Sequence, residues 1–127
     1  MTIVSYGVLI NEALYAAELL WEHGISAEVL KLNTIAPLDT DAVASSVTKT
    51  GKLVVVEDCV ENGCVGERLA AELDKMVKAH ETLILKNLGN QFTPQGKVAL
   101  LRAAAGIDAK GIFASVTEVV EHGKEKT

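Results

Sequence analysis

Cysteine, proline and aromatic residues are scarce in this sequence. Its 127 residues include two cysteines, two prolines and only one Trp, two Tyr and two Phe. So few cysteines exclude a disulfide-rich scaffold, and so few aromatic rings exclude a core built on ring stacking. The apolar 49% of the chain is instead mostly valine, leucine, isoleucine and alanine, which suits a layered α/β domain.

Basic residues are too few to form a nucleic acid surface. Twelve Lys and Arg stand against 17 Asp and Glu, giving a formal net charge of -5 and a pI near 5.1. We therefore expect no nucleic acid partner. No apolar run approaches the roughly 20 residues that a membrane-spanning helix needs, and no charged-then-apolar leader opens the chain. The sequence thus predicts no membrane association and a cytoplasmic location.

The residues that commonly ligate metals are not grouped in the sequence. Cys59 and Cys64 have the spacing of half a metal site, but His23, His80 and His122 fall in separate segments with no paired spacing. We therefore predict two free thiols in a reducing compartment and no metal site.

Short β-branched runs alternate with segments of helical periodicity along the chain. The predicted strands are residues 2–6 "TIVSY", 27–32 "AEVLKL", 52–58 "KLVVVED" and 82–88 "TLILKNL". Because each strand is followed by a helical segment, the connections are right-handed crossovers between parallel strands. The fold class predicted is a three-layer α/β/α sandwich with a mainly parallel sheet, formed by a single domain over residues 1–127.

Capping residues predict where the helices begin and end. The first helix runs from about residue 10 to residue 23, and Asp39 is placed to cap the second. Thr93 and Pro94 match an N-cap and first helical residue for the fourth helix, which would turn Val98 inward. A short closing helix would begin with a capping box of Ser115 and Glu118. Glycines at 24, 51 and 106 are predicted stops.

Function in such sheets concentrates in the loops at the carboxyl ends of the strands. These loops carry no dinucleotide fingerprint, no P-loop and no nucleophile elbow, so no catalytic residue is predicted. Gly63 and Gly66 open a helix whose amino end could hold an anion, although glycines at such a bend are more often turn residues. Glu57 and Asp58 could be a functional pair, although acids leaving a buried strand are more often solvated.

An ordered set of segments gives a more specific indication. "TIVSYG", "LNTIAPLD", "KLVVVED", "NGCVGERLA" and "NLGNQFTPQG", followed by "GIDAKGI", resemble the C-terminal domain of transketolase-type thiamine diphosphate enzymes. The "PLD" element is shared with transketolases and with the β subunits of 2-oxoacid dehydrogenases. The "NLG" and "GIDAKGI" segments are most similar to 1-deoxyxylulose-5-phosphate synthase, which serves isoprenoid precursor biosynthesis.

The resemblance implies a transferase part that is inactive by itself. Thiamine diphosphate and magnesium would be held by the preceding domains, while this domain packs on them, joins in homodimerisation and forms some wall near the substrate entrance. The substrate-entrance candidates are Asn33, where the synthases commonly carry a phosphate-binding arginine, and Gln95, where they often carry histidine. The enzyme would transfer a two-carbon unit to a sugar or aldose phosphate, and a transketolase proper is the alternative within the family.

Two further functions remain open from the sequence: a non-catalytic α/β binding or interaction module, and a small flavodoxin-like nucleotide binder. Relatives begin this domain with one more, antiparallel strand before the segment that matches "TIVSYG", so we expect this chain to be a fragment. We also expect "AEVLKL" to border the sheet beside "TIVSY". An unprotected border would favour self-association.

Overall fold

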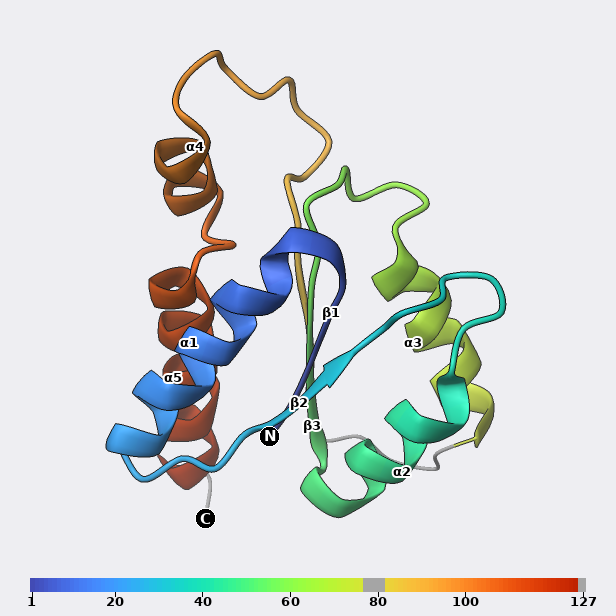
Figure 1. Cartoon of the computed structure of the whole chain (residues 1–127). Coiled ribbons are helices and arrows are strands. Elements are labelled where there is room, and N and C mark those ends of the chain that lie inside the picture. Colours follow the sequence, from blue (N-terminus) through green and yellow to red (C-terminus); the bar gives the residue numbers. More distant parts are fainter. Residues whose placement is uncertain (77–81, 126–127) are drawn as a thin grey trace.

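The computed structural model describes residues 1–76 and 82–125 of the chain (Figure 1). His80, one of the histidines considered as a metal ligand, lies outside these residues. The elements in chain order are β1 (Thr2–Ser5), η1 (Gly7–Leu9), α1 (Ile10–Glu22), β2 (Glu28–Lys31), α2 (Thr40–Thr50), β3 (Lys52–Val56), α3 (Val65–Met76), β4 (Thr82–Lys86), α4 (Val98–Ala105) and α5 (Ala109–Glu125). The predicted alternation of strands and helices is confirmed.

The four strands form one parallel sheet in the order β2-β1-β3-β4. Ile3 of β1 stands between Val29 of β2 and Val54 of β3 in the register. The predicted position of "AEVLKL" at a border beside the first strand is therefore confirmed.

The sheet is covered by helices on both faces, as Figure 1 shows. Alternate side chains point to opposite faces of a strand. Ile3 and Val54 therefore pack with α1 and α5, whereas Val4 and Val55 pack with α2 and α3. The central residues of β3 are at most 1% exposed, as expected for a strand between two helical layers. The three-layer α/β/α sandwich is confirmed.

The start and the end of α2 follow the predicted capping chemistry. The Asp39 carboxylate accepts a hydrogen bond of 3.2 Å from the Ala42 N–H, which satisfies one of the free donors at the helix start. Gly51 ends the helix with φ 73°, in the left-handed region that favours glycine. Gly106 ends α4 in the same way with φ 69°.

The predicted start of the fourth helix at Thr93 and Pro94 is wrong. Helix α4 begins at Val98, and residues 91–100 are all exposed. Val98, predicted to point inward, is 59% exposed. The Thr-Pro pair has the local signature of a helix start, but a turn of helix at that point would bury no apolar face against the described residues. The helix therefore forms only over the segment that contains Leu101 and Ala105, which are partly buried.

The predicted capping box at Ser115 and Glu118 is also wrong, because α5 already begins at Ala109. The Asp108 carboxylate accepts from the Gly111 N–H at 2.8 Å, and Glu12 of α1 accepts from the Ala109 N–H at 2.8 Å. Ser115 lies inside the helix, where its hydroxyl accepts a 3.0 Å hydrogen bond from Lys86 of β4. The capping oxygens that decide the start therefore come from one residue before the helix and from a residue distant in sequence.

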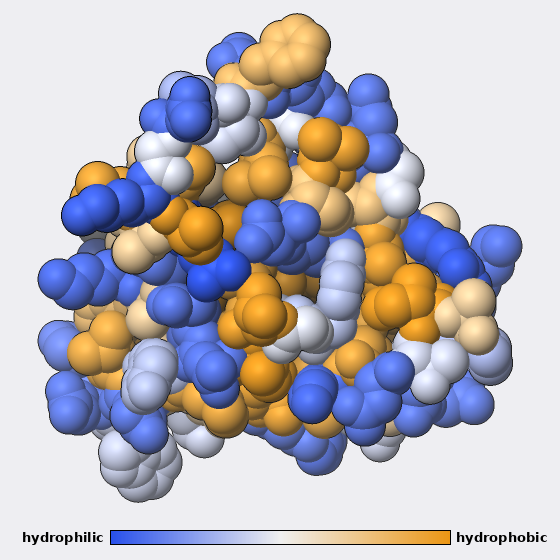
Figure 2. Space-filling view, turned by 45° about the horizontal axis from the view of Figure 1, so that its top comes forward, coloured by the Kyte–Doolittle hydropathy of each residue, from blue (hydrophilic) through white to orange (hydrophobic). Residues whose placement is uncertain are grey.

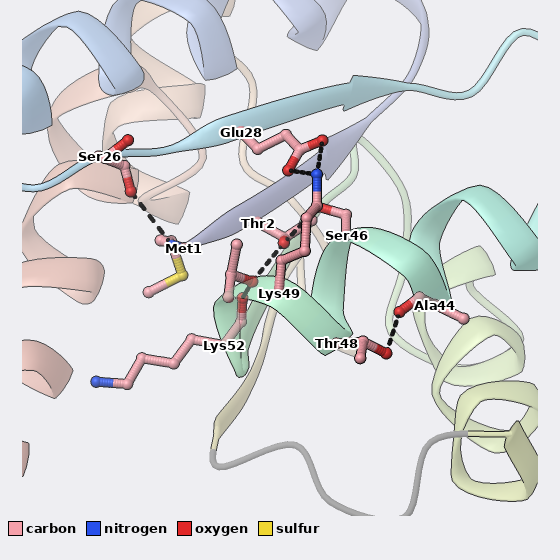
Figure 3. Close-up of polar contacts among 10 residues, drawn as sticks. Met1, Thr2, Ser26, Glu28, Ala44, Ser46, Thr48, Lys49 and Lys52 are labelled. Atoms are coloured by element: carbon pink, nitrogen blue, oxygen red, sulfur yellow. Dashed lines mark hydrogen bonds and ion pairs between the residues drawn. The ribbon is translucent and has the colours of Figure 1, made fainter.

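Polar contacts fix α2 against the amino-terminal side of the sheet (Figure 3). The buried Thr2 hydroxyl lies 2.8 Å from the Ser46 hydroxyl and 2.7 Å from that of Thr50. Lys49 of α2 forms a 2.9 Å ion pair with Glu28 of β2. These contacts hold β1 and β2 in position under α2. Among the described residues, no helix combines the length and apolarity needed to cross a bilayer.

Candidate functional site at the carboxyl edge of the sheet

The loops after the four parallel strands meet at one end of the domain, which Figure 2 turns toward the reader. Hydrophobic side chains are exposed between hydrophilic ones over this face. Of the four predicted site residues, Asn33, Gly63 and Gln95 lie in these loops, and Gly66 lies in the first turn of α3. We refer to this end of the molecule as the carboxyl edge.

A buried carboxylate organises the loop after β3. Glu57 is only 1% exposed. Its Oε1 accepts from the Val65 N–H at 2.8 Å, and its Oε2 accepts from the Gly66 N–H at 2.7 Å. Both donors belong to the first turn of α3, where unpaired N–H groups and the helix dipole favour a negative charge. The chain's own carboxylate thus occupies the place where such a helix could bind an anion.

Tyr6, which follows β1, joins the same carboxylate. Its hydroxyl donates to Glu57 Oε1 at 2.9 Å, so the loops after β1 and β3 are linked through one side chain. Burial, followed by the hydrogen bond to Glu57, raises the pKa of the Tyr6 phenol. The Cys59 thiol lies 3.7 Å from Glu57 Oε1. Burial and then the Glu57 charge raise the pKa of that thiol to about 11.

This arrangement corrects one expectation and refines another. The interpretation of Glu57 as a solvated loop residue is wrong, because its carboxylate is buried and fully engaged. Position 66 has no room for a side chain. A Cβ atom there would lie 2.8 Å from Glu57 Oε2 and 2.8 Å from Leu85 Cδ2, so the site requires glycine. The Gly63 N–H donates to Glu67 at 3.0 Å. The N–H groups of both predicted anion-binding glycines therefore already bind carboxylates of this chain.

Asp58 behaves as the solvated acid that the sequence suggested. Its side chain is 41% exposed and pairs with Arg102 of α4 across 3.3 Å. The Nε atom of Arg102 is buried and has no hydrogen-bond partner within the described residues. These adjacent acids therefore have different roles. Asp58 pairs with the Arg102 side chain at the surface, whereas Glu57 caps the start of α3 inside the domain.

The loop after β4 is anchored only in its first half. Leu88 N–H donates to the Cys59 carbonyl at 2.9 Å, and Asn90 donates to Glu61 at 2.8 Å. Beyond Asn90, residues 91–96 form no hydrogen bond with the described part of the chain, and Phe92 is fully exposed. Phe92 and Pro94 line a shallow cavity of about 250 Å³ together with side chains of α4.

Asn33 and Gln95 are both exposed, but the fold does not bring them together. Asn33 follows β2 and Gln95 follows β4, which are the two border strands of the sheet. Three strand spacings separate those strands, about 14 Å. Asn33 lines a cavity of about 160 Å³ together with Asp39, whose carboxylate would repel a phosphate. Asn33 and Gln95 therefore do not form one shared site within the described residues.

Cys59 and Cys64 are free thiols, as predicted. Cys64 is buried, and that burial raises its pKa. Across residues 1–76 and 82–125, His, Cys, Asp and Glu side chains form no group of three or more suited to a metal ion.

The fold and this edge can be compared with known proteins. The sequence model of the transketolase C-terminal domain matches residues 1–112. The chain belongs to this family. A solved structure titled "Split gene transketolase, inactive beta4 tetramer" superposes with a TM-score of 0.83 at 26% identity, covering 92% of this chain and 38% of that one.

Curated relatives include β subunits of the pyruvate dehydrogenase E1 component. The protein of Staphylococcus epidermidis (strain ATCC 35984) is 45% identical over 73 residues, which are 58% of this chain and 22% of that protein. The protein of Bacillus subtilis (strain 168) is 37% identical over 87 residues, covering 68% of this chain and 27% of its own length. The transketolase-type family predicted from sequence is confirmed. These relatives do not specifically support the 1-deoxyxylulose-5-phosphate synthase branch, and this chain spans about a quarter of their length.

The Glu57 cap was missed by sequence reasoning, although a signal for it exists. An acid directly after a buried strand, followed by a glycine at the first turn of the next helix, is a pattern in which the acid can turn back to the helix start. Tyr6 could not be assigned this way, because only the pairing of β1 with β3 brings it to Glu57.

Proposed function

We propose that this chain is the C-terminal domain of a thiamine diphosphate-dependent enzyme of the kind represented by pyruvate dehydrogenase E1 β subunits. The observation that carries this proposal is the combination of the family match over residues 1–112 with 37–45% identity to those subunits. The domain is cytoplasmic and works with thiamine diphosphate-binding domains and a second copy of the enzyme. Its two free thiols suit a reducing compartment.

The described residues do not fit the cofactor itself. A magnesium diphosphate needs several oxygen ligands for the metal and free donors for the phosphates. The described residues offer no acidic cluster for the ion, and the N–H groups that open α3 are bound to Glu57. We therefore assign no step of the thiamine chemistry to this chain and give it a packing role beside the cofactor-binding domains.

The loop after β4 and the first turn of α4 form the surface best suited to that role. Phe92, Val98 and Leu100 are 106%, 59% and 67% exposed, and they belong to a stretch of ten exposed residues. Exposed apolar side chains that gather on one edge are typical of protein–protein contacts. A neighbouring domain seated on this edge would remove them from water.

Two measurements test the proposal. Calorimetric titration of the purified 127-residue chain with thiamine diphosphate and magnesium should show no binding, and micromolar affinity would overturn the packing role. Co-expression with the thiamine diphosphate-binding domains should yield a stable complex that decarboxylates pyruvate. A complex that forms but uses only ketose phosphates as donors would assign the chain to a transketolase instead.

A 1-deoxyxylulose-5-phosphate synthase domain is the second candidate, favoured by the "NLG" and "GIDAKGI" segments. Under this candidate Asn33 stands where a phosphate-binding arginine is expected. Asn33→Arg would add charge-assisted hydrogen bonds worth about 1.5–3 kcal/mol each. In the assembled enzyme the KM for a phosphorylated substrate should then fall relative to that of its unphosphorylated analogue, with Asn33→Lys as a second cationic variant. An unchanged ratio in both variants would exclude this loop as the phosphate site.

A further inference from the structure

Two thiols flank the exposed bend between β3 and α3 (Figure 1). Cys59 follows the strand and is partly exposed, whereas Cys64 directly precedes the helix and is 5% exposed. The Cys59 thiol donates to Glu57 Oε1 across 3.7 Å. The N–H of Val65, the residue after Cys64, donates to the same oxygen at 2.8 Å. Both ends of the bend therefore meet at one buried carboxylate oxygen.

Backbone hydrogen bonds hold the bend in this closed shape. The Cys64 N–H donates to the Glu61 carbonyl at 3.2 Å, which closes a turn. Gly63 within the turn has φ 77°, in the left-handed region that favours glycine. On the other side of the bend, the Cys59 carbonyl accepts from the Leu88 N–H at 2.9 Å. The backbone of each cysteine is thus fixed beside Glu57.

The two thiols influence each other's ionisation. Burial is the main cause of the raised pKa of Cys59, the Glu57 charge is the next, and the Cys64 charge adds to both. Burial also raises the pKa of Cys64, while the Glu67 N–H, which donates to its sulfur at 3.4 Å, acts in the opposite direction. Both thiols are therefore protonated at neutral pH, and only a small thiolate fraction can react.

The exposure of the two thiols assigns them different roles. Cys59 is partly exposed and adjoins residues 60–63, which are all exposed, so a small oxidant can reach its sulfur. Cys64 is buried, and its sulfur lies against the first turn of α3. An accessible thiol beside a shielded one is the arrangement in which the first is oxidised and the second resolves it.

We propose that Cys59 and Cys64 form a reversible disulfide with hydrogen peroxide as the oxidant. The Cys59 thiolate attacks one peroxide oxygen, the O–O bond breaks, and the departing hydroxide takes up a proton to leave as water. The Cys64 thiolate then attacks the sulfur of the resulting sulfenic acid, the S–O bond breaks, the S–S bond forms, and a second water leaves. Each sulfur loses one electron, and the peroxide gains both. This modification site does not depend on the proposed enzyme function.

Intact-mass spectrometry of the 127-residue chain tests the site. Hydrogen peroxide should give a monomer lighter by two hydrogens that takes up no alkylating reagent, and dithiothreitol should restore both thiols. Cleavage after Glu61 by a glutamate-specific protease should leave the fragments on either side joined. The rate should rise about tenfold per pH unit between pH 7 and 9, because the thiolate of a group with a pKa of about 11 is the reacting form.

Two serine variants separate the roles of the thiols. Cys64→Ser should stop at the Cys59 sulfenic acid, which dimedone traps as a single adduct. Cys59→Ser should react with peroxide about tenfold more slowly or less, because its remaining thiol is buried. Equal rates in the two variants would overturn these roles. If a variant does not fold, the unaltered chain decides: no disulfide, a disulfide only between two chains, or a rate independent of pH would each overturn the proposal.

Discussion

The loops after β3 and β4 lie side by side at the carboxyl edge but are stabilised in different ways. The loop after β3 is organised around the buried Glu57 carboxylate, which binds the start of α3 and the Tyr6 hydroxyl. The loop after β4 is tied to its neighbour as far as Asn90, and the next ten residues are exposed. In the first loop, residues of this chain satisfy the hydrogen bonds of Glu57. The second loop exposes apolar side chains such as Phe92. One loop of this edge therefore stabilises the domain, whereas the other exposes apolar side chains to solvent.

The largest expected effect is at Glu57. Glu57→Ala would leave the Val65 and Gly66 N–H groups and the Tyr6 hydroxyl without their acceptor. The free energy of unfolding should fall by about 3–5 kcal/mol, because each buried group left unpaired costs about 1–3 kcal/mol. Urea denaturation measures this loss. Asp58→Asn is the matched control at the adjacent acid and should cost less than about 1 kcal/mol, since it breaks a surface ion pair. Equal losses in the two variants would disprove the cap.

Glycine-to-alanine exchanges compare the two loops directly. Gly66→Ala places its Cβ 2.8 Å from Leu85 and from Glu57, so the packed first loop must shift, at a cost of about 1–3 kcal/mol. In the second loop, the added Cβ of Gly96→Ala meets only the Leu101 side chain, at 3.4 Å from Cδ2 and 3.7 Å from Cγ, which are ordinary contacts. Its effect on unfolding should stay within about 0.5 kcal/mol. Thermal unfolding of both variants checks the difference, and a Gly96→Ala loss as large as that of Gly66→Ala would refute it.

The first loop should also make the domain sensitive to alkaline pH. The pKa of Cys59 rises from 9.0 in its ordinary state to about 11 in the fold, and that of Tyr6 also rises above its ordinary 10.0. Both groups are neutral when protonated, so the unfolded chain loses these protons first as the pH increases. The stability they contribute is therefore complete below pH 9 and declines above it.

Urea midpoints between pH 8 and 11 measure this decline. Cys59→Ala should reduce the component that begins near pH 9, to which the Cys64 thiol also contributes, and Tyr6→Phe should remove the component that begins near pH 10. Tyr15→Phe alters an exposed tyrosine of α1 and is the matched control. A decline that persists unchanged in the Cys59→Ala and Tyr6→Phe variants would assign the pH dependence to other groups.

The sequence predicts much of the fold because local signals and tertiary packing agree there. The apolar centre of β3, the Asp39 cap and the stops at Gly51 and Gly106 all required only neighbouring residues to interpret. Prediction failed where distant groups decide. The start of α5 depends partly on Glu12, and Ser115 is used by Lys86 instead of capping a helix. At the carboxyl edge the sequence located the loops, but the role of Glu57 depends on strand pairing that brings Tyr6 to it.

The smallest effect on stability is expected at Phe92, where the effect on association should be large. Its side chain is 106% exposed, so Phe92→Ser removes almost no packing and should change the free energy of unfolding by less than about 0.5 kcal/mol. If the second loop is an interaction surface, the same change should weaken binding to the thiamine diphosphate-binding domains by about tenfold or more, as expected for an aromatic residue at the centre of an interface. Tyr15→Ser is the matched control, because Tyr15 is an aromatic residue of α1 that is 58% exposed. Calorimetric titration between the purified parts should separate the two variants. Equal affinities of the two variants would show that the loop after β4 does not bind the thiamine diphosphate-binding domains. The contact with the rest of the enzyme would then lie on another surface of the domain, and the two loops would differ only in their effect on stability.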